Sequence, residues 1–408
     1  MKKITEYLNV IISSADISNP SGQELASTAI LIGNQTVHWS GDNYFKLKGA
    51  IGDALKTDRD LVKSYSIKTF EDEAIKYLRP NIQSQTTIND SIAADFKNLL
   101  IEKPIIRFRV VRDIHGIALK NIQTILTLGP YDIFHFESHK KVYENIVDVP
   151  LPDMLWRNSS KSFLISYSVE SRDQQKAIEV ADISFEKFET TISFLMGLPV
   201  GEFEVGILNY SGWKVQRAFL FGDNRGYYDT SNAVGPMQQV TLDQDYFVNK
   251  KLGYDRLWEL VASTRLTEIE SKTLLAIQWI GYALRDPNIQ SAFMKVAISL
   301  EIIFTYHEKE IINPSILYRI SEGAALILGN NADERFEIEA DIKKLYSIRS
   351  SIAHSGKANV HSSDYYSILK YARNVVLKLL SNKRLVKINT PEQLFKKLKK
   401  MKYSCEAI

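Results

Sequence analysis

The chain has 408 residues, of which 45% are hydrophobic and 24% charged, and its formal net charge at pH 7 is +3. This composition excludes a largely disordered chain, and at about 150 residues per domain the length predicts two or three domains. The mild charge neither requires nor excludes a nucleic-acid partner, so any such partner has to be argued from local patches.

Strand signals dominate the chain from its start to about residue 245. Short runs of β-branched and aromatic residues, bounded by turn residues, predict strands. These runs cover residues 28–32, 105–111, 122–128, 163–169, 203–208 and 213–219.

Two helices interrupt this series of strands. One is predicted over residues 69–78, with Pro80 just beyond its end. The other carries apolar residues at helical spacing between Phe185 and Leu195, and Gly197 and Pro199 supply its stop. We interpret residues 1–245 as a β-rich α+β domain that senses a trigger or restrains the rest of the chain.

From about residue 255 the apolar residues recur at helical spacing. Four or five amphipathic helices are predicted, with apolar stripes over residues 274–284, 293–307, 316–327, 338–352 and 365–379. Their short connections predict an all-α bundle over residues 255–382. The remaining segment, 383–408, is a basic tail. The fold class is therefore predicted to be α+β.

Cysteine content and hydropathy indicate the cellular compartment in which the protein is expected. The single cysteine, Cys405, excludes an intrachain disulfide and any multi-cysteine metal site. The most apolar stretch, residues 274–284, is too short to span a membrane. Glu6 and Asn9 interrupt the apolar region that a signal peptide needs. We therefore expect a cytoplasmic protein that does not bind membranes.

Most catalytic signatures are absent from the sequence. It contains no Walker loop, no dinucleotide-binding fingerprint, no zinc-protease motif and no nucleophile elbow. The seven histidines are scattered and do not pair convincingly on one helix. We therefore expect neither a metal site nor a cofactor.

An arginine and a histidine lie close together at the end of a predicted helix. Arg349 follows Ile342 by seven residues, which places its guanidinium near the centre of an apolar stripe. Such a charge has to be paired or directed at an anion. His354 can exchange a proton near neutral pH. Together the two side chains suffice to cleave RNA without a metal, because the RNA supplies its own 2′-OH nucleophile.

The spacing of this pair raises a geometric difficulty. On an unbroken helix, residues five apart are separated by about 140° of rotation, so Arg349 and His354 do not share a face. They converge if the chain turns after Ala353, as Ser355 and Gly356 permit, or if a two-fold dimer brings two sets into one cleft. We favour the dimer, because it also explains an arginine on an apolar stripe.

These residues carry a family resemblance. The segment 345–356, Leu-Tyr-Ser-Ile-Arg-Ser-Ser-Ile-Ala-His-Ser-Gly, resembles the signature helix of HEPN domains, particularly the Apea-like HEPN group of bacterial defence proteins. Residues 293–304 resemble the helix of that family with an acidic residue in an apolar run, and residues 320–329 fit its next helix. The resemblance covers roughly residues 255–382, and the N-terminal half is similar only weakly, around residues 192–205.

The resemblance implies a metal-independent endoribonuclease that dimerises through its helical domain and acts as an anti-phage, abortive-infection or toxin effector. Arg349 and His354 map onto the Arg-x4–6-His motif of the family. Ser350 occupies the position after the arginine, and Glu301 maps onto the acidic residue that orients or balances it. Many HEPN domains have instead lost activity and serve as binding or dimerisation modules.

Non-catalytic interpretations remain open beside the nuclease. Arg349 and Glu301 would then form only a packing salt bridge, and His354 would only cap a helix. Tyr346 is a supporting residue that contacts either RNA or the core. The tail lysines either guide RNA or form a solvated helix face; they are Lys396, Lys397, Lys399 and Lys400. The alternative function is a non-catalytic HEPN dimer whose N-terminal domain recognises a ligand or partner.

Overall fold

The structure of the chain is a computed structural model. It describes residues 2–17, 27–32, 35–147, 163–199, 201, 203–212, 214–221, 227–235, 238–305, 316–355 and 359–404. Helices make up most of this part, and the strands form small sheets in the first 241 residues. The predicted α+β class is confirmed.

The chain forms two compact units. The first contains Met1–Val110 and Ser168–Ile183, and the second contains Val111–Tyr167 and Ser184–Ile408. The chain passes between them within β3 (Ile106–Ile114), β7 (Phe163–Ser171) and α8 (Gln174–Met196). The division predicted near residue 245 lies inside the second unit.

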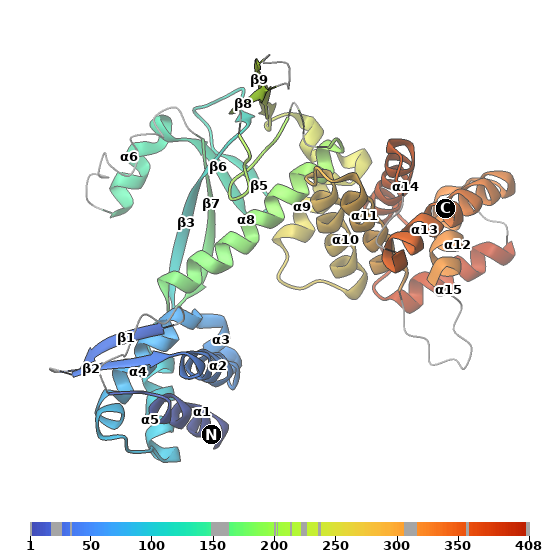
Figure 1. Cartoon of the computed structure of the whole chain (residues 1–408). Coiled ribbons are helices and arrows are strands. Elements are labelled where there is room, and N and C mark those ends of the chain that lie inside the picture. The colour runs from blue at the N-terminus through green and yellow to red at the C-terminus, as the bar shows by residue number, and fades with distance from the viewer. Residues whose placement is uncertain are drawn as a thin grey trace. The chain divides into compact units, whose positions relative to one another are not determined.

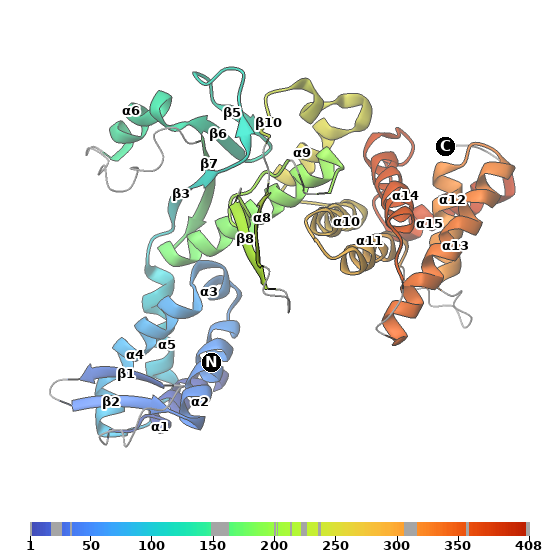
Figure 2. The same cartoon turned by 45° about the horizontal axis from the view of Figure 1, so that its top comes forward.

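The first unit is mostly helical, although strands were expected to prevail there (Figure 2). Its elements are α1 (Lys2–Ser13), β1 (Ser27–Ile32), β2 (Gln35–Ser40), α2 (Asp42–Lys56), α3 (Arg59–Ser64), α4 (Ile67–Ser84) and α5 (Asp90–Glu102). The predicted strand 28–32 is confirmed as β1, which pairs antiparallel with β2. Polar side chains cap α3, α4 and α5. Their apolar faces bury Phe70 and Phe96 in one core with Trp39 of the hairpin.

Helix α4 extends beyond its predicted end. The sequence placed its last turn before Pro80, but the helix continues through Pro80 to Ser84. A proline inside a helix removes one N–H donor and leaves the carbonyl four residues earlier unpaired. Here that carbonyl belongs to exposed Lys76, and Arg79 and Pro80 are exposed too. Water can therefore satisfy the freed carbonyl.

A four-stranded sheet has the strand order β3-β7-β6-β5, with β5 (Leu126–Leu128) and β6 (Tyr131–His135) joined by a tight turn. Helix α6 (Phe136–Val147) follows β6. The strands predicted over 105–111 and 163–169 are confirmed as β3 and β7. The strand predicted over 122–128 is shorter than expected. Its first residues form a turn in which Asn121 accepts a hydrogen bond from the Gln123 backbone N–H at 3.0 Å.

The strand predicted over residues 203–208 is wrong. This segment is an irregular loop that makes only isolated bridges to other segments. The backbone N–H groups of Leu208 and Asn209 donate to the carboxylate of Glu189 on α8, at 2.9 and 3.1 Å. Those donors are therefore unavailable to a strand ladder. Helix α8 itself ends as predicted, with Gly197 in the left-handed conformation at φ 71°.

Two small ladders and two short 3₁₀ turns complete the region before the bundle. The pairs are β4 (Ile117–Ala118) with β10 (Val240–Thr241), and β8 (Lys214–Phe221) with β9 (Tyr227–Val234). Strand β8 confirms most of the run predicted over 213–219, of which Trp213 lies outside the described residues. The turns are η1 (Asp245–Val248) and η2 (Lys250–Leu252).

The predicted helical bundle is present (Figure 1). Its helices are α9 (Tyr254–Ala262), α10 (Glu268–Leu284), α11 (Ile289–Phe304), α12 (Ile316–Leu328), α13 (Ala332–Ser355), α14 (Ser362–Ser381) and α15 (Pro391–Ser404). Thr267 and Glu270 form a capping box at the start of α10, and Asn288 caps α11. Residues 306–315 and 356–358, which include His307, Asn313 and Gly356, lie outside the described residues.

The bundle packs directly against the second half of α8, which explains why both belong to one unit. A Cβ atom at Gly281 of α10 would lie 2.4 Å from the backbone oxygen of Thr190, so only glycine permits this approach. Arg373 of α14 donates a hydrogen bond to the backbone oxygen of Phe194 at 3.0 Å. Both contacts tie the bundle to α8.

The predicted basic tail contains a packed helix, α15. Leu394, Leu398 and Met401 are buried on one side of it. Lys402 forms an ion pair with Glu322 of α12 at 2.5 Å and donates to the hydroxyl of Tyr318 at 2.8 Å. Among the described residues, no helix has both the length and the apolar content needed to cross a membrane.

Candidate functional site

Helix α13 carries the predicted Arg–His pair. Asn331 begins the helix by accepting a hydrogen bond from the backbone N–H of Glu334 at 2.9 Å. Ile342 and Leu345 are buried within the bundle. This apolar stripe sets the rotation of the helix, and it turns Arg349, two turns after Ile342, toward α11.

Glu301 of α11 binds both Arg349 and Tyr346. Nη2 of Arg349 lies 2.8 Å from Oε1 of Glu301, and the Tyr346 hydroxyl donates to the same oxygen. The guanidinium also lies over the Tyr346 ring, 5.8 Å from its centroid. The structure therefore brings three of the predicted residues together, and Glu301 balances the arginine as the sequence suggested.

The environment of this group is partly shielded from water. The side chain of Arg349 is 28% exposed and that of Glu301 is 19% exposed. Burial, and then the hydrogen bond to Glu301, raise the pKa of the Tyr346 hydroxyl far above its usual value of 10.0. Tyr346 therefore stays protonated and donates to the carboxylate. The buried Nε of Arg349 has no hydrogen-bond partner among the described residues.

His354 and Ser350 lie elsewhere on the helix surface. Both are exposed, and α13 continues without a break through Ser355. The arrangement in which the chain turns after Ala353 is therefore wrong. Within one chain, Arg349 and His354 are about 140° apart around the helix and about 7.5 Å apart along it. Convergence in a two-fold dimer stays a prediction.

The lysines predicted to bind RNA lie on α15. Lys396, Lys399 and Lys400 are exposed and share one face of the helix with Tyr403, whose side chain is 76% exposed. Lys397 is only half-exposed and interacts within the chain. Helix α12 packs against both α13 and α15. The lysines therefore lie on a different helix from the Arg349 group, which is formed by α11 and α13.

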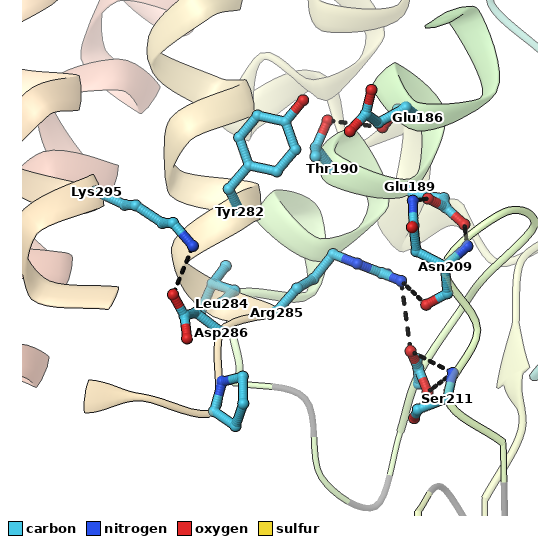
Figure 3. Close-up of a pocket in the computed structure, with 12 residues that line it drawn as sticks. Glu186, Glu189, Thr190, Asn209, Ser211, Tyr282, Leu284, Arg285, Asp286 and Lys295 are labelled. Carbon is cyan, nitrogen blue, oxygen red and sulfur yellow. Dashed lines mark hydrogen bonds and ion pairs between the residues drawn. The ribbon is translucent and has the colours of Figure 1, made fainter. Parts of the chain in front are cut away.

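A cavity of about 550 Å³ that the sequence did not indicate lies between α8, the 203–211 loop and the α10–α11 junction (Figure 3). Its polar and charged lining residues are Glu186, Glu189, Thr190, Glu204, Asn209, Ser211, Tyr282, Arg285, Asp286 and Lys295. Arg285 donates to the backbone oxygens of Val205 and Asn209 at 2.9 and 2.7 Å. It also forms an ion pair with Glu204 at 3.4 Å.

Most charges in this cavity are balanced by neighbours within the fold. Asp286 pairs with Lys295 at 2.5 Å, and Glu189 is satisfied by the loop. Burial and the nearby Glu186 carboxylate raise the pKa of Tyr282 to about 12. Nowhere in the described ranges do three or more His, Cys, Asp or Glu side chains gather as metal ligands. We therefore assign these residues to holding the loop against α8 and α10.

The sequence did contain one signal for this network. Glu189 follows Phe188 directly in the predicted helix 185–195 and is almost completely buried. A carboxylate in such a position needs hydrogen-bond donors from elsewhere in the chain. The sequence did not indicate that the donors come from the next loop.

No family model, curated protein or solved structure matches the chain.

Proposed function

We propose that the chain is a metal-independent endoribonuclease of the HEPN type that works as a homodimer in anti-phage defence or as a toxin. One observation supports this most strongly: Glu301 fixes Arg349 through a single nitrogen, Nη2. The side chain of Arg349 is 28% exposed, so part of its guanidinium is accessible from solvent, although its Nε is buried. A guanidinium positioned in this way is suited to hold a phosphate.

The chemistry needs only positioning, charge stabilisation and proton transfer. The RNA 2′-oxygen attacks the adjacent phosphorus while the bond from phosphorus to the 5′-oxygen breaks. In each site, the His354 imidazole of one copy accepts the proton of the 2′-OH, and the leaving 5′-oxygen takes its proton from solvent water. Arg349 stabilises the charge on the phosphate oxygens. The products are a 2′,3′-cyclic phosphate and a 5′-hydroxyl.

A dimer supplies the geometry that one chain lacks. Arg349 and His354 point to different faces of α13, so a cleft formed by two antiparallel copies of this helix pairs the arginine of one copy with the histidine of the other. The exposed lysines of α15 add a positive surface that attracts the RNA backbone.

The test is cleavage of RNA by the purified full chain in excess EDTA. We expect fragments that end in 2′,3′-cyclic phosphate, identified by mass spectrometry. Arg349→Ala and His354→Ala should each abolish cleavage while circular dichroism shows an unchanged helix content. Full activity of the His354→Ala protein would contradict the assignment. Lys63→Ala, an exposed substitution on α3, is the matched control.

A second candidate function has its own support. The ion pair with Glu301 already occupies Arg349, and His354 lies on another face, as expected for a non-catalytic dimerisation or binding module. This alternative predicts no cleavage by the wild-type chain under any condition. It also predicts that His354→Ala leaves dimerisation and partner binding unchanged.

A further inference from the structure

A second cavity, of about 530 Å³, lies in the first unit. All of its lining residues come from the first 97 residues, so none belongs to the helical bundle. Three helices line it. The residues are Lys2, Lys3, Ile4 and Tyr7 from α1, Asp53 and Lys56 from α2 with Thr57 just after it, and Lys97 from α5. Four of the eight lining residues are therefore lysines, against a single carboxylate.

The four lysines differ in whether a nearby carboxylate neutralises their charge. Lys97 forms a 2.6 Å ion pair with Asp58, and its hydrogen bond outweighs burial and lowers the pKa of the Asp58 carboxyl. Lys56 lies 3.6 Å from Asp53. Lys2 and Lys3 are exposed and form no ion pair with any described residue. Two cations at the rim thus lack a counter-charge.

The rest of the lining favours an anion. Lys2, Lys3 and Ile4 form the first turn of α1, which contains no acidic residue to neutralise its unpaired backbone N–H groups. The hydroxyls of Tyr7 and Thr57 add polar groups from two further positions. Like charges gathered around one hollow repel each other, and a bound anion relieves that repulsion.

We propose that this cavity binds the di- or triphosphate group of a small ligand. The ligand is expected to be about as large as a nucleoside triphosphate. Its volume lies within the range of about 300–1,000 Å³ that is usual for small-ligand sites. Lysine ammonium groups donate charge-assisted hydrogen bonds to phosphate oxygens. The half-buried ring of Tyr7 provides apolar surface for the remainder of the ligand. The first unit would then be a ligand-binding unit, whether or not the bundle cleaves RNA.

Isothermal titration calorimetry of the full chain at low salt tests this proposal, with inorganic pyrophosphate, ATP and adenosine as separate probes. We expect pyrophosphate and ATP to bind and adenosine not to bind. The double variant Lys2→Glu/Lys3→Glu should bind at least about tenfold more weakly, since each charge-assisted hydrogen bond contributes about 1.5–3 kcal/mol. The control Lys63→Glu/Lys68→Glu changes two exposed lysines of the same unit that do not line the cavity.

Three outcomes would overturn the proposal. In the first, neither pyrophosphate nor ATP binds the wild-type chain. In the second, the Lys2/Lys3 variant binds as tightly as wild type or no more weakly than the control. In the third, a single-stranded RNA binds the wild-type chain and loses affinity in the Lys2/Lys3 variant, while pyrophosphate and ATP do not bind, which would assign the surface to nucleic acid. Because no cleavage is measured, the result is independent of the proposed nuclease.

Discussion

Arg349 and Tyr346 lie one turn apart on α13 and bind the same oxygen of Glu301, which belongs to α11. One carboxylate therefore fixes the position of the guanidinium and of the phenol together. Because the charged pair is largely removed from water, loss of one partner leaves the other partly buried and uncompensated. This relationship has consequences that can be measured without an activity assay.

The first prediction concerns stability. Glu301→Gln and Arg349→Gln should each lower the free energy of unfolding by about 1–3 kcal/mol, because each leaves a shielded charge without its counter-charge. The double variant should lose less than the sum of the two, with an interaction energy of about 0.5–3 kcal/mol. Urea denaturation of the wild type, the two single variants and the double variant completes this double-mutant cycle. Additive losses would mean that the ion pair makes no energetic contribution.

The second prediction concerns the composition of the active site. In the proposed nuclease, the Arg349→Ala and His354→Ala proteins should each be inactive, but an equal mixture should recover about a quarter of wild-type activity if each site takes its arginine from one copy and its histidine from the other. Half of the dimers are then mixed, and one of their two sites is intact. Cleavage is measured after denaturing and refolding the mixture to exchange subunits. Absence of recovery would exclude a site shared in this way.

The third prediction concerns the lysine face of α15. Lys396→Glu/Lys399→Glu/Lys400→Glu should raise the KM for RNA more than it lowers kcat, because in the proposed nuclease these side chains attract the RNA backbone and do not contact the reacting atoms. The dependence of RNA affinity on salt should also become weaker. The matched control is Lys63→Glu/Lys68→Glu. If the α15 variant has the same KM for RNA as this control, the three lysines do not contribute to RNA binding.

Periodicity in the sequence was sufficient to predict the helical bundle. Apolar residues such as Ile342 and Leu345 repeat at helical spacing, and their burial in the structure follows directly from that pattern. The same spacing placed Arg349 toward the bundle and Glu301 in the facing apolar helix. The pairing of Arg349 with Glu301, 48 residues earlier, was expected from the resemblance to HEPN domains, which places an acidic residue opposite the arginine.

Other features depend on long-range contacts that a local pattern does not reveal. The 203–208 segment has strand-like composition, but its N–H groups bind Glu189. Helix α4 passes through Pro80 because the freed carbonyl faces solvent. Lys2 and Lys97, which line the cavity of the first unit, are far apart in the sequence and line one cavity because α1 packs against α5.

The fourth prediction concerns the loop held by Glu189. Glu189→Ala should lower the free energy of unfolding by about 1–3 kcal/mol or more, since backbone donors of the loop lose their acceptor. Cleavage by a protease within residues 203–211 should also become faster. Glu186→Gln is the control, because Glu186 lines the same cavity without binding the loop backbone. Equal protease sensitivity in both variants would contradict this role of Glu189.

The fifth prediction concerns acid stability and Asp173, which precedes α8. Burial by itself raises the pKa of this carboxyl, but hydrogen bonds from Ser66, Thr69 and Gln175 outweigh burial and lower the pKa below 3.8. A carboxyl with a lowered pKa in the folded state stabilises the fold above its unfolded-state pKa, and this contribution is lost as the pH falls through the folded-state value.

Asp173→Asn should therefore be less stable than wild type at pH 6, and the difference should shrink as the pH falls below about 4. Urea denaturation between pH 3 and pH 6 measures both proteins. Asp72→Asn, which changes an exposed aspartate of α4, should follow the wild-type curve across this range. A constant difference between Asp173→Asn and wild type at every pH would show that the carboxyl acts through its shape and hydrogen bonds. The charge of Asp173 would then contribute nothing to the stability of the contact between α4 and the start of α8.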